Sequence, residues 1–154
     1  MKKNTFINRH KQPTSLGGVE TAAKIMSLMK TNMATTIIGD IAKKDEKLAI
    51  EIQENMFLFD SLAKIDDRSI QKILQKTRND QLAVALKNSN KIVQDKFYKN
   101  MSKRAKKRLS DDMEMLGDLK TSDIELAQKN ITRSARKMAD AGEIILEINR
   151  QEFS

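Results

Sequence analysis

The feature that most constrains the fold is the spacing of the apolar residues, which recur every three or four positions along most of the chain. The pattern starts at Val19 and continues as far as Met138. This spacing places apolar side chains along one side of an α-helix. The residues that an all-β fold needs are scarce, because the sequence has one proline, five glycines and only 4% aromatic residues. We therefore expect an all-α protein.

The pattern predicts eight helices of about 8 to 18 residues joined by short loops, in an α-solenoid-like or multi-helix bundle. They begin near Val19, Asn32, Asp45, Asp66 or Asp67, Asn79 or Asp80, Ser89 or Asn90, Ser102, and Ser122, which forms a capping box with Glu125. Glycines end the last two helices, at Gly117 and near Gly142. Beyond them, residues 144–148 are predicted to form a short helix or strand. The residues expected to face inward are Val19, Ala22, Ala23, Met26, Met29, Met33, Ile37, Ile38, Ile41, Leu48, Ile52, Met56, Ile70, Ile73, Leu74, Leu82, Ala85, Leu86, Ile92, Val93, Phe97, Met101, Ala105, Leu109, Met113, Leu116, Ile131, Ala135 and Met138.

The composition excludes several classes of function. The sequence has no cysteine, which rules out a disulfide scaffold, a thiol nucleophile and the usual structural zinc sites. Its single histidine, His10, lies in a basic N-terminal stretch without helical periodicity, so a Ser-His-Asp triad is not expected. No apolar run approaches the roughly 18 residues that a membrane span needs. We expect a non-enzymatic protein without a cofactor or a metal site.

The formal net charge of +8 raises the question of nucleic-acid binding, and the answer depends on where the charge lies. Four of the 29 basic residues (Lys2, Lys3, Arg9 and Lys11) precede Gly17, and no acidic residue does. The remaining chain carries 25 basic and 21 acidic residues. Most of the chain is therefore of mixed sign, whereas a dedicated DNA-binding protein usually shows a stronger one-sided stripe.

One predicted helix, which begins after Ser102, has an unusual distribution of charge. At about 100° per residue, Arg104, Arg108 and Asp111 lie in one narrow sector. Lys107 and Asp112 flank this sector. A separate sector carries the apolar residues Ala105, Leu109, Met113 and Leu116. One side of the helix is thus expected to be core and the other a charged ridge.

The order of these charges is unfavourable for the helix itself. A helix N-terminus favours acidic residues and a C-terminus favours basic ones, but here the basic residues come first, at a cost of ~0.3–1 kcal/mol for each misplaced charge. The pairs Lys107–Asp111 and Arg108–Asp112 are expected to recover ~0.2–0.5 kcal/mol each. Two interpretations follow: a solvated helix face, or a docking surface with a positive and a negative end that binds a partner weakly and with defined orientation.

Several ordered motifs resemble those of the FliG family of flagellar motor switch proteins. They are the stretches at residues 17–25, Met56-Phe57-Leu58-Phe59, residues 66–71, Ala85-Leu86-Lys87, residues 100–105, and Asp111-Asp112. The resemblance extends from Gly17 to about Ile148. It implies a C-terminal half of such a protein, so we expect the chain to be a fragment or a truncated gene product.

The resemblance also implies a domain organisation. The expected architecture is an armadillo-like, right-handed superhelical stack of short helices in two subdomains. Residues 1–18 are a basic arm with a Gly17-Gly18 joint, 19–55 an armadillo-like subdomain, and 56–65 a hinge segment. Residues 66–148 are a C-terminal helical bundle that carries the charged helix, and 149–154 are a tail. The implied hinge residues are Gly17, Gly18, Met56, Phe57, Leu58 and Phe59.

The function implied by the resemblance is that of a rotor component. The charged helix would contact the cytoplasmic loop of the stator protein MotA to generate torque, and rearrangement at the hinge would set the direction of rotation. Other implied partners are neighbouring FliG subunits and the switch protein FliM, at the cytoplasmic face of the inner membrane in the flagellar basal body. The protein would meet the membrane only through the rotor ring. The implied stator-facing charges are Lys87, Arg104, Asp111, Asp112 and Lys120, the last at a position where the family often has arginine.

Two other functions are weighed against this one. A basic all-α nucleic-acid-binding domain would place residues 103–108 on backbone phosphates. Asp111, Asp112 and Glu114 argue against it, because they would repel phosphate. An enzyme that uses paired carboxylates lacks any recognisable site in the sequence.

Overall fold

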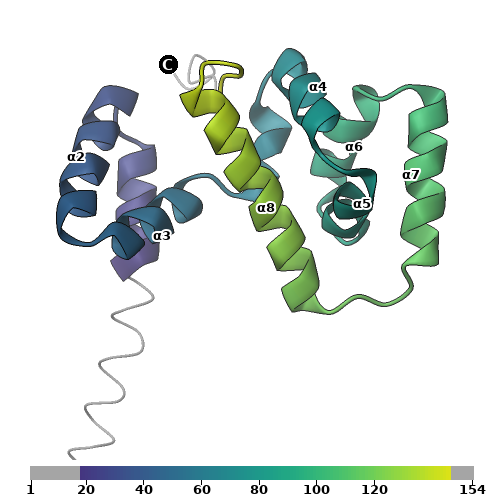
Figure 1. The fold of residues 1–154 in the computed structure, drawn as a ribbon, viewed down its shortest axis with the longest axis horizontal. Coiled ribbons are helices and arrows are strands. Elements are labelled where there is room, and N and C mark those ends of the chain that lie inside the picture. The colour runs from purple at the N-terminus through teal and green to yellow at the C-terminus, as the bar shows by residue number, and fades with distance from the viewer. Residues whose placement is uncertain (1–17, 147–154) are drawn as a thin grey trace, which may run out of the picture. The chain divides into compact units, whose positions relative to one another are not determined.

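A computed structural model describes residues 18–146 of the chain, and Figure 1 shows its helices. Within that range every regular element is a helix and no strand forms, which confirms the all-α prediction. The chain divides into two compact units, one up to Phe57 and one from Leu58. This boundary falls inside the segment 56–65, for which a hinge role stays a prediction. The arm with His10 and Gly17, residues 147–148 and the tail of residues 149–154 lie outside the described range.

The described part of the first unit, residues 18–57, consists of three helices around a small apolar core. The helix of residues 18–27 is followed by α2 (Thr31–Lys44) and α3 (Glu46–Met56). The predicted cap of α3 is confirmed, because a side-chain oxygen of Asp45 accepts a hydrogen bond of 3.1 Å from the backbone N–H of Leu48. The core of this unit is formed by Ala23, Met26, Ala34, Ile38, Ala49 and Ile52.

The second unit begins with a 3₁₀-helix and continues with five α-helices. Its elements are η1 (Phe59–Lys64), α4 (Asp67–Lys76), α5 (Asn79–Lys87), α6 (Lys91–Lys99), α7 (Lys103–Met115) and α8 (Thr121–Asp140). Helix α5 packs against both α7 and α8, while η1 packs against α6 and α8. Helix α7 lies at the outer edge of this unit, so one of its sides is open (Figure 1).

The core of the second unit forms around two stacked aromatic rings. The rings of Phe59 in η1 and Phe97 in α6 lie 5.9 Å apart at an interplanar angle of 9°. Leu62 and Ile65 are also buried, and their spacing of three matches the period of a 3₁₀-helix. The resemblance implied a hinge for this segment, and the helix η1 was not predicted from the sequence.

Most helix ends lie where the sequence predicts them. Asp66, rather than Asp67, caps α4, while Asn90 caps α6 and Ser102 caps α7. At the end of α8, Gly142 has φ 77° and its N–H bonds to the carbonyl of Ala139. The N–H of the next residue bonds to the carbonyl of Met138, which completes a Schellman motif. Gly117, with φ 62°, follows α7 in the same left-handed conformation.

Some local predictions near helix ends differ from the structure. The capping box at Ser122 and Glu125 is wrong, because the N-cap residue of α8 is Lys120, two residues before Ser122, and no side chain caps the helix. Helix α5 begins at Asn79 as predicted, but the residue at its N-cap position is Arg78, which makes no capping bond. Residues 144–146 form neither a helix nor a strand.

Three residues predicted to face inward are exposed: Met33, Leu48 and Ile92. In each case the buried position is taken by the next residue along the helix, and these are Ala34, Ala49 and Val93. The hydrophobic spacing therefore located each helix correctly but misassigned one residue on each, while Ile38, Ile52 and Phe97 on the same helices are buried as predicted.

The two serines near helix starts provide a matched test of capping. In α7 the Ser102 hydroxyl oxygen accepts a hydrogen bond of 3.1 Å from the N–H of Ala105, whereas Ser122 makes no such contact within the described residues. We expect Ser102→Ala to lower the free energy of unfolding by about 1 kcal/mol. Ser122→Ala should change it by less than about 0.5 kcal/mol. Urea denaturation followed by circular dichroism measures both, and equal effects would contradict the assignment.

Candidate functional site

Helix α7 packs against the rest of the second unit through a narrow apolar face. Leu109 is fully buried, while Ala105, Met113 and Leu116 are half-buried. The Tyr98 hydroxyl from α6 donates a hydrogen bond to Met113 Sδ at 3.5 Å. Burial, with the nearby Asp95 carboxylate, raises the pKa of Tyr98, so the hydroxyl keeps the proton that it donates. These contacts place the apolar sector inward, as the sequence predicts.

The opposite side of α7 presents its charges to solvent. Arg104, Arg108 and Asp111 are all exposed. Together with Lys103, Lys107 and Asp112 they line a shallow, open groove along the helix. Arg104 and Asp111 are seven residues apart, which separates them by about 10 Å along the helix axis. The groove is therefore positive near the start of α7 and negative near its end.

The charges of this face are not neutralised by one another. The expected pairs Lys107–Asp111 and Arg108–Asp112 do not come within the 4.0 Å of an ion pair. This prediction was wrong because the pairs have their basic member first, the weaker orientation, and both partners gain more from hydration. Among residues 18–146, no side-chain hydrogen bond or ion pair involves Arg104, Arg108 or Asp111. They are available to a partner.

Asp112 differs from its neighbour Asp111. Its side chain is half-buried, and one of its carboxylate oxygens accepts a hydrogen bond from Asn79 Nδ2 at the start of α5. Asn79 also lines a second shallow groove, together with Arg104 and Arg108. The sequence placed Asp112 at the flank of the charged ridge but did not reveal this contact, because 33 positions separate the two residues.

The remaining implied charges lie on other elements of the second unit. Lys87 is the half-buried last residue of α5, where a positive charge is favoured by the helix dipole. Lys120 is exposed and directly precedes α8. Neither belongs to the groove of α7. Their contact with a stator stays a prediction.

The implied hinge residues have mixed environments. Met56 is half-buried at the end of α3, and Phe57 follows it as a buried residue. Leu58 is exposed, and Phe59 is buried in its stack with Phe97. Gly18 is the first residue of the N-terminal helix in the described range.

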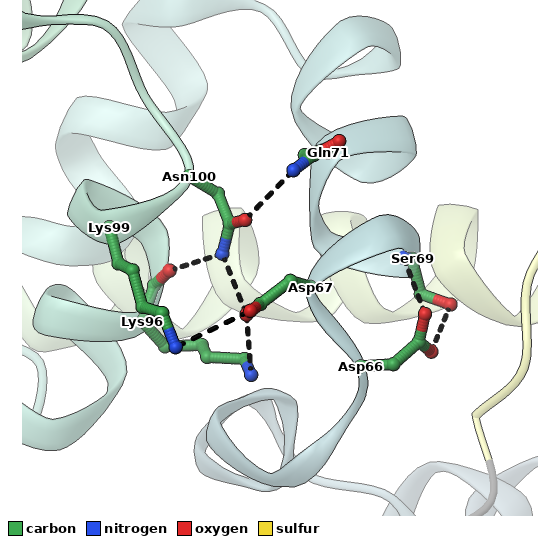
Figure 2. A network of polar contacts seen from close by, with 7 residues as sticks. All are labelled: Asp66, Asp67, Ser69, Gln71, Lys96, Lys99 and Asn100. Carbon is green, nitrogen blue, oxygen red and sulfur yellow. Dashed lines mark hydrogen bonds and ion pairs between the residues drawn. The ribbon is translucent and has the colours of Figure 1, made fainter.

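A polar network holds the segment from which α7 starts (Figure 2). Asp67, at the first position of α4, pairs with Lys96 Nζ at 2.8 Å and with Lys99 Nζ at 3.3 Å. It also accepts a hydrogen bond of 3.1 Å from Asn100 Nδ2. The Asn100 amide oxygen accepts in turn from Gln71 Nε2 at 3.1 Å. Since Asn100 lies two residues before the cap of α7, the network ties the start of α7 to α4.

The network changes the acidity of the carboxylates within it. Hydrogen bonds from Lys96 and then from Asn100 hold the pKa of Asp67 well below its usual range. The pKa of Asp66 is also lowered, chiefly by a hydrogen bond of 2.6 Å from the Ser69 hydroxyl. That hydroxyl accepts a bond of 3.2 Å from the N–H of Ile145, which ties the end of the described chain to α4. Because Ser69 and Ile145 are 76 positions apart, no local sequence pattern indicates their contact.

The described residues show no sign of a metal site or a membrane span. Within residues 18–146, no three His, Cys, Asp or Glu side chains gather as metal ligands would. In the same range no helix has the length and apolarity to cross a bilayer. The fold and the groove define a helical domain that displays unpaired charges of both signs on an edge helix.

Comparison with known proteins agrees with this description. The chain belongs to the FliG C-terminal domain family, whose model matches residues 39–146. It is 42% identical over 142 residues to the flagellar motor switch protein FliG of Vibrio cholerae, covering 92% of this chain and 41% of the relative. It is 42% identical over 146 residues to the protein of the same name from Pseudomonas aeruginosa, covering 95% and 43%.

Solved structures show the same fold. Full-length FliG from Aquifex aeolicus superposes with a TM-score of 0.77 at 35% identity, covering 86% of this chain and 44% of that one. A FliG segment from Helicobacter pylori, residues 116–343 in its own numbering, has a TM-score of 0.66 at 34% identity, covering 83% and 56%. The chain spans about two fifths of the length of the relatives from Vibrio cholerae and Pseudomonas aeruginosa.

The acidity of Asp67 leads to a prediction for the dependence of stability on pH. Because its pKa is lower in the folded than in the unfolded chain, Asp67 stabilises the fold at pH values above its ordinary pKa of 3.8. This contribution is lost as the pH falls from there towards the folded-state pKa. We expect Asp67→Asn to lower the urea midpoint clearly at pH 7, by an amount that shrinks below about pH 4.

Asp60→Asn is the matched control for this measurement. Asp60 is exposed in η1, and its carboxylate has no hydrogen bond or ion pair among the described residues. The control should leave the midpoint nearly unchanged at pH 7. A difference between wild type and Asp67→Asn that stays constant from pH 7 to pH 3 would show that the network does not act through the charge of Asp67.

Proposed function

We propose that the chain is a rotor component of a flagellar motor switch, and that the charged face of α7 contacts a stator protein to generate torque. The observation that carries the proposal is the exposure of Arg104 and Asp111 without a partner among the described residues. Membership of the FliG C-terminal domain family supports it, because the matched relatives are named flagellar motor switch proteins. The proposal involves no catalytic reaction.

The chemistry of the α7 face suits a contact that is made and broken many times. An exposed ion pair contributes only ~0–1 kcal/mol, and salt screens it beyond ~8 Å. Charges therefore guide a partner into register without holding it. Basic residues at one end of the groove and acidic residues at the other specify the orientation of the partner.

The proposal assigns partners to the other residues of the implied set. Lys87, Asp112 and Lys120 join Arg104 and Asp111 in facing the cytoplasmic loop of the stator protein MotA. Neighbouring FliG subunits and FliM are the partners within the rotor, at the cytoplasmic face of the inner membrane in the basal body. Gly17, Gly18 and the segment from Met56 to Phe59 act as hinges, and rearrangement there sets the direction of rotation.

Nothing in the structure favours the alternative of nucleic-acid binding. The groove that contains Lys103, Arg104, Lys107 and Arg108 also contains Asp111 and Asp112. A phosphate backbone laid along this groove would meet two carboxylates at one end, where the negative charges repel each other.

Charge reversal in a motile host tests the torque assignment. The host's own copy is replaced by a full-length chimera that carries this chain in its C-terminal half. We expect Arg104→Glu and Asp111→Lys to reduce swimming speed, most clearly where the stator's own charges are weakened, because attraction at the contact becomes repulsion. Tracking of single cells measures the speed.

Lys106→Glu is the matched control for Arg104→Glu. It makes the same charge change on α7, at an exposed residue outside both grooves. It should leave swimming close to that of the unmodified chimera. Normal swimming of the Arg104 and Asp111 variants in the weakened-stator strain would contradict the torque assignment.

The first unit offers a surface for a neighbouring rotor subunit. Of the residues predicted as its core, Met26 and Ile38 are buried, and Met29, Ile37 and Ile41 pack half-buried against them. Its exposed apolar side chains include Ile25, Leu28 and Met33, with Leu28 at 80% exposure. Apolar side chains gathered on a surface favour association.

We expect the chain to self-associate at high concentration and Leu28→Lys to weaken this association, as measured by light scattering. Ile92→Lys is the control, because Ile92 is an exposed apolar residue of the second unit. A strictly monomeric wild-type chain, or equal effects of the two variants, would count against this surface.

A further inference from the structure

The second groove lies where the start of α7 meets the start of α5, and its charge differs from that of the groove along α7. The residues that line it are Asn79, Ser102, Arg104, Ala105 and Arg108. Arg104 and Arg108 also line the groove along α7, which contains Asp111 and Asp112 as well. Among the described residues, no acid lines the second groove. The groove along α7 is therefore of mixed sign, whereas the second groove is positive.

The two arginines of the second groove are neighbours of like charge. They are four residues apart, so they lie on the same face of α7, about 6 Å apart along its axis. Like charges at this spacing destabilise a helix slightly. Both side chains are exposed, and neither has a hydrogen bond or an ion pair within residues 18–146. A negative group bound between them would relieve the repulsion and accept from their N–H donors.

The uncharged residues of the second groove add further donors. Ser102 Oγ accepts a hydrogen bond of 3.1 Å from the N–H of Ala105, which leaves its hydroxyl proton able to donate to a ligand. The Asn79 amide uses one of its two hydrogens in the bond to Asp112 and keeps the other. Asp112 itself does not line this groove and forms no ion pair with Arg108. The groove therefore offers two positive charges and neutral donors to one small anion.

An acidic side chain fits this groove better than the phosphate backbone of a nucleic acid does. Each guanidinium presents its donors in a planar fork that matches the two oxygens of a carboxylate. The positive surface extends only about 6 Å along α7, and Asp111 and Asp112 lie on the adjoining groove. A backbone that continued past the arginines would bring further phosphates towards these acids. A single aspartate or glutamate side chain ends within the positive surface.

We propose that the second groove binds one carboxylate of a protein partner, an aspartate or glutamate side chain that Arg104 and Arg108 hold together. Arg108 is then a partner-contacting residue in addition to the implied set of stator-facing charges. The inference rests on the proposed function, in which the partner is the stator. It deepens that function by naming the chemical group that binds at the positive end of α7 and by adding a second residue that binds it.

The first measurement uses the chain itself with acetate, a singly charged carboxylate, as the probe. NMR follows the Nε–H signals of the arginines during a titration at constant ionic strength. We expect Arg104 and Arg108 to titrate together, at an acetate concentration about threefold lower than a lone arginine requires, because a second charge contact adds to the first. Arg68 is the internal control, since it is exposed on α4 and lines neither groove.

Neutral substitutions test whether the two arginines act as one site. Arg108→Gln should weaken acetate binding at Arg104 to the level of Arg68, and Arg104→Gln should do the same at Arg108. Lys106→Gln is the matched control, because it removes one positive charge from α7 at an exposed residue outside both grooves. It should leave the titration nearly unchanged. Dimethyl phosphate, a singly charged probe for a nucleic-acid backbone, should bind no more tightly than acetate.

The second measurement identifies the source of the carboxylate in the chimera. Each acidic residue of the stator's cytoplasmic loop is replaced in turn by its amide. We expect Arg104→Gln and Arg108→Gln each to lower the swimming speed. One of the stator substitutions should abolish the further effect of both, because the carboxylate that they share is gone. Lys106→Gln should leave the speed unchanged in every stator background.

Several results would overturn the inference. In the titration they are signals of Arg104 and Arg108 that behave like that of Arg68, or tighter binding of dimethyl phosphate than of acetate. In the chimera they are coupling of the two arginines to different stator residues, or normal swimming of Arg108→Gln where Arg104→Glu is slowed. The proposed function fails separately, if Arg104→Glu and Asp111→Lys both swim normally. A titration with the expected result would then keep the carboxylate site and exclude the stator as its partner.

Discussion

The burial of Leu109 is the contact on which the functional arrangement depends. Helix α7 is so polar that one fully buried side chain and three half-buried ones hold it against the domain. Because a helix has fixed angular spacing, burial of this side determines that Arg104, Arg108 and Asp111 face outward. The sequence of α7 places the basic residues at the start of the helix and the acidic ones towards its end, against the direction of its dipole. The stability of the fold has to come from elsewhere.

The rest of the second unit supplies that stability close to where α7 begins. Phe59 and Phe97 stack in the core, and Lys96 and Lys99 bind Asp67 just before the Ser102 cap. Lys96 is only 17% exposed, so this ion pair is better shielded from solvent than the charges of α7. Paired charges thus hold the frame, whereas Arg104, Arg108 and Asp111 of the outer helix have no side-chain partner among the described residues. A helix whose surface charges are unfavourable for its own stability can therefore belong to a stable domain.

The sequence predicted what depends on local spacing. Helical class, most caps and the two faces of α7 follow from residues at most a few positions apart. The sequence did not predict contacts between distant segments, such as the bonds of Asp112 to Asn79 and of Asp67 to Lys96. It also misassigned three single residues as buried, Met33, Leu48 and Ile92, because burial at the border of a helix face depends on the neighbouring helix. The short η1 helix was missed for lack of a repeat.

The difference between Asp111 and Asp112 follows from the same reasoning. Two adjacent acidic residues read identically in a sequence, but only one can share the direction of Arg104 on a helix. The other points about 100° away, where the start of α5 offers an amide donor and the positive end of a dipole. Asp112 keeps one bond inside the domain, whereas Asp111 has no side-chain partner among the described residues. The helix geometry that exposes the first acid of the pair therefore brings the second one to α5.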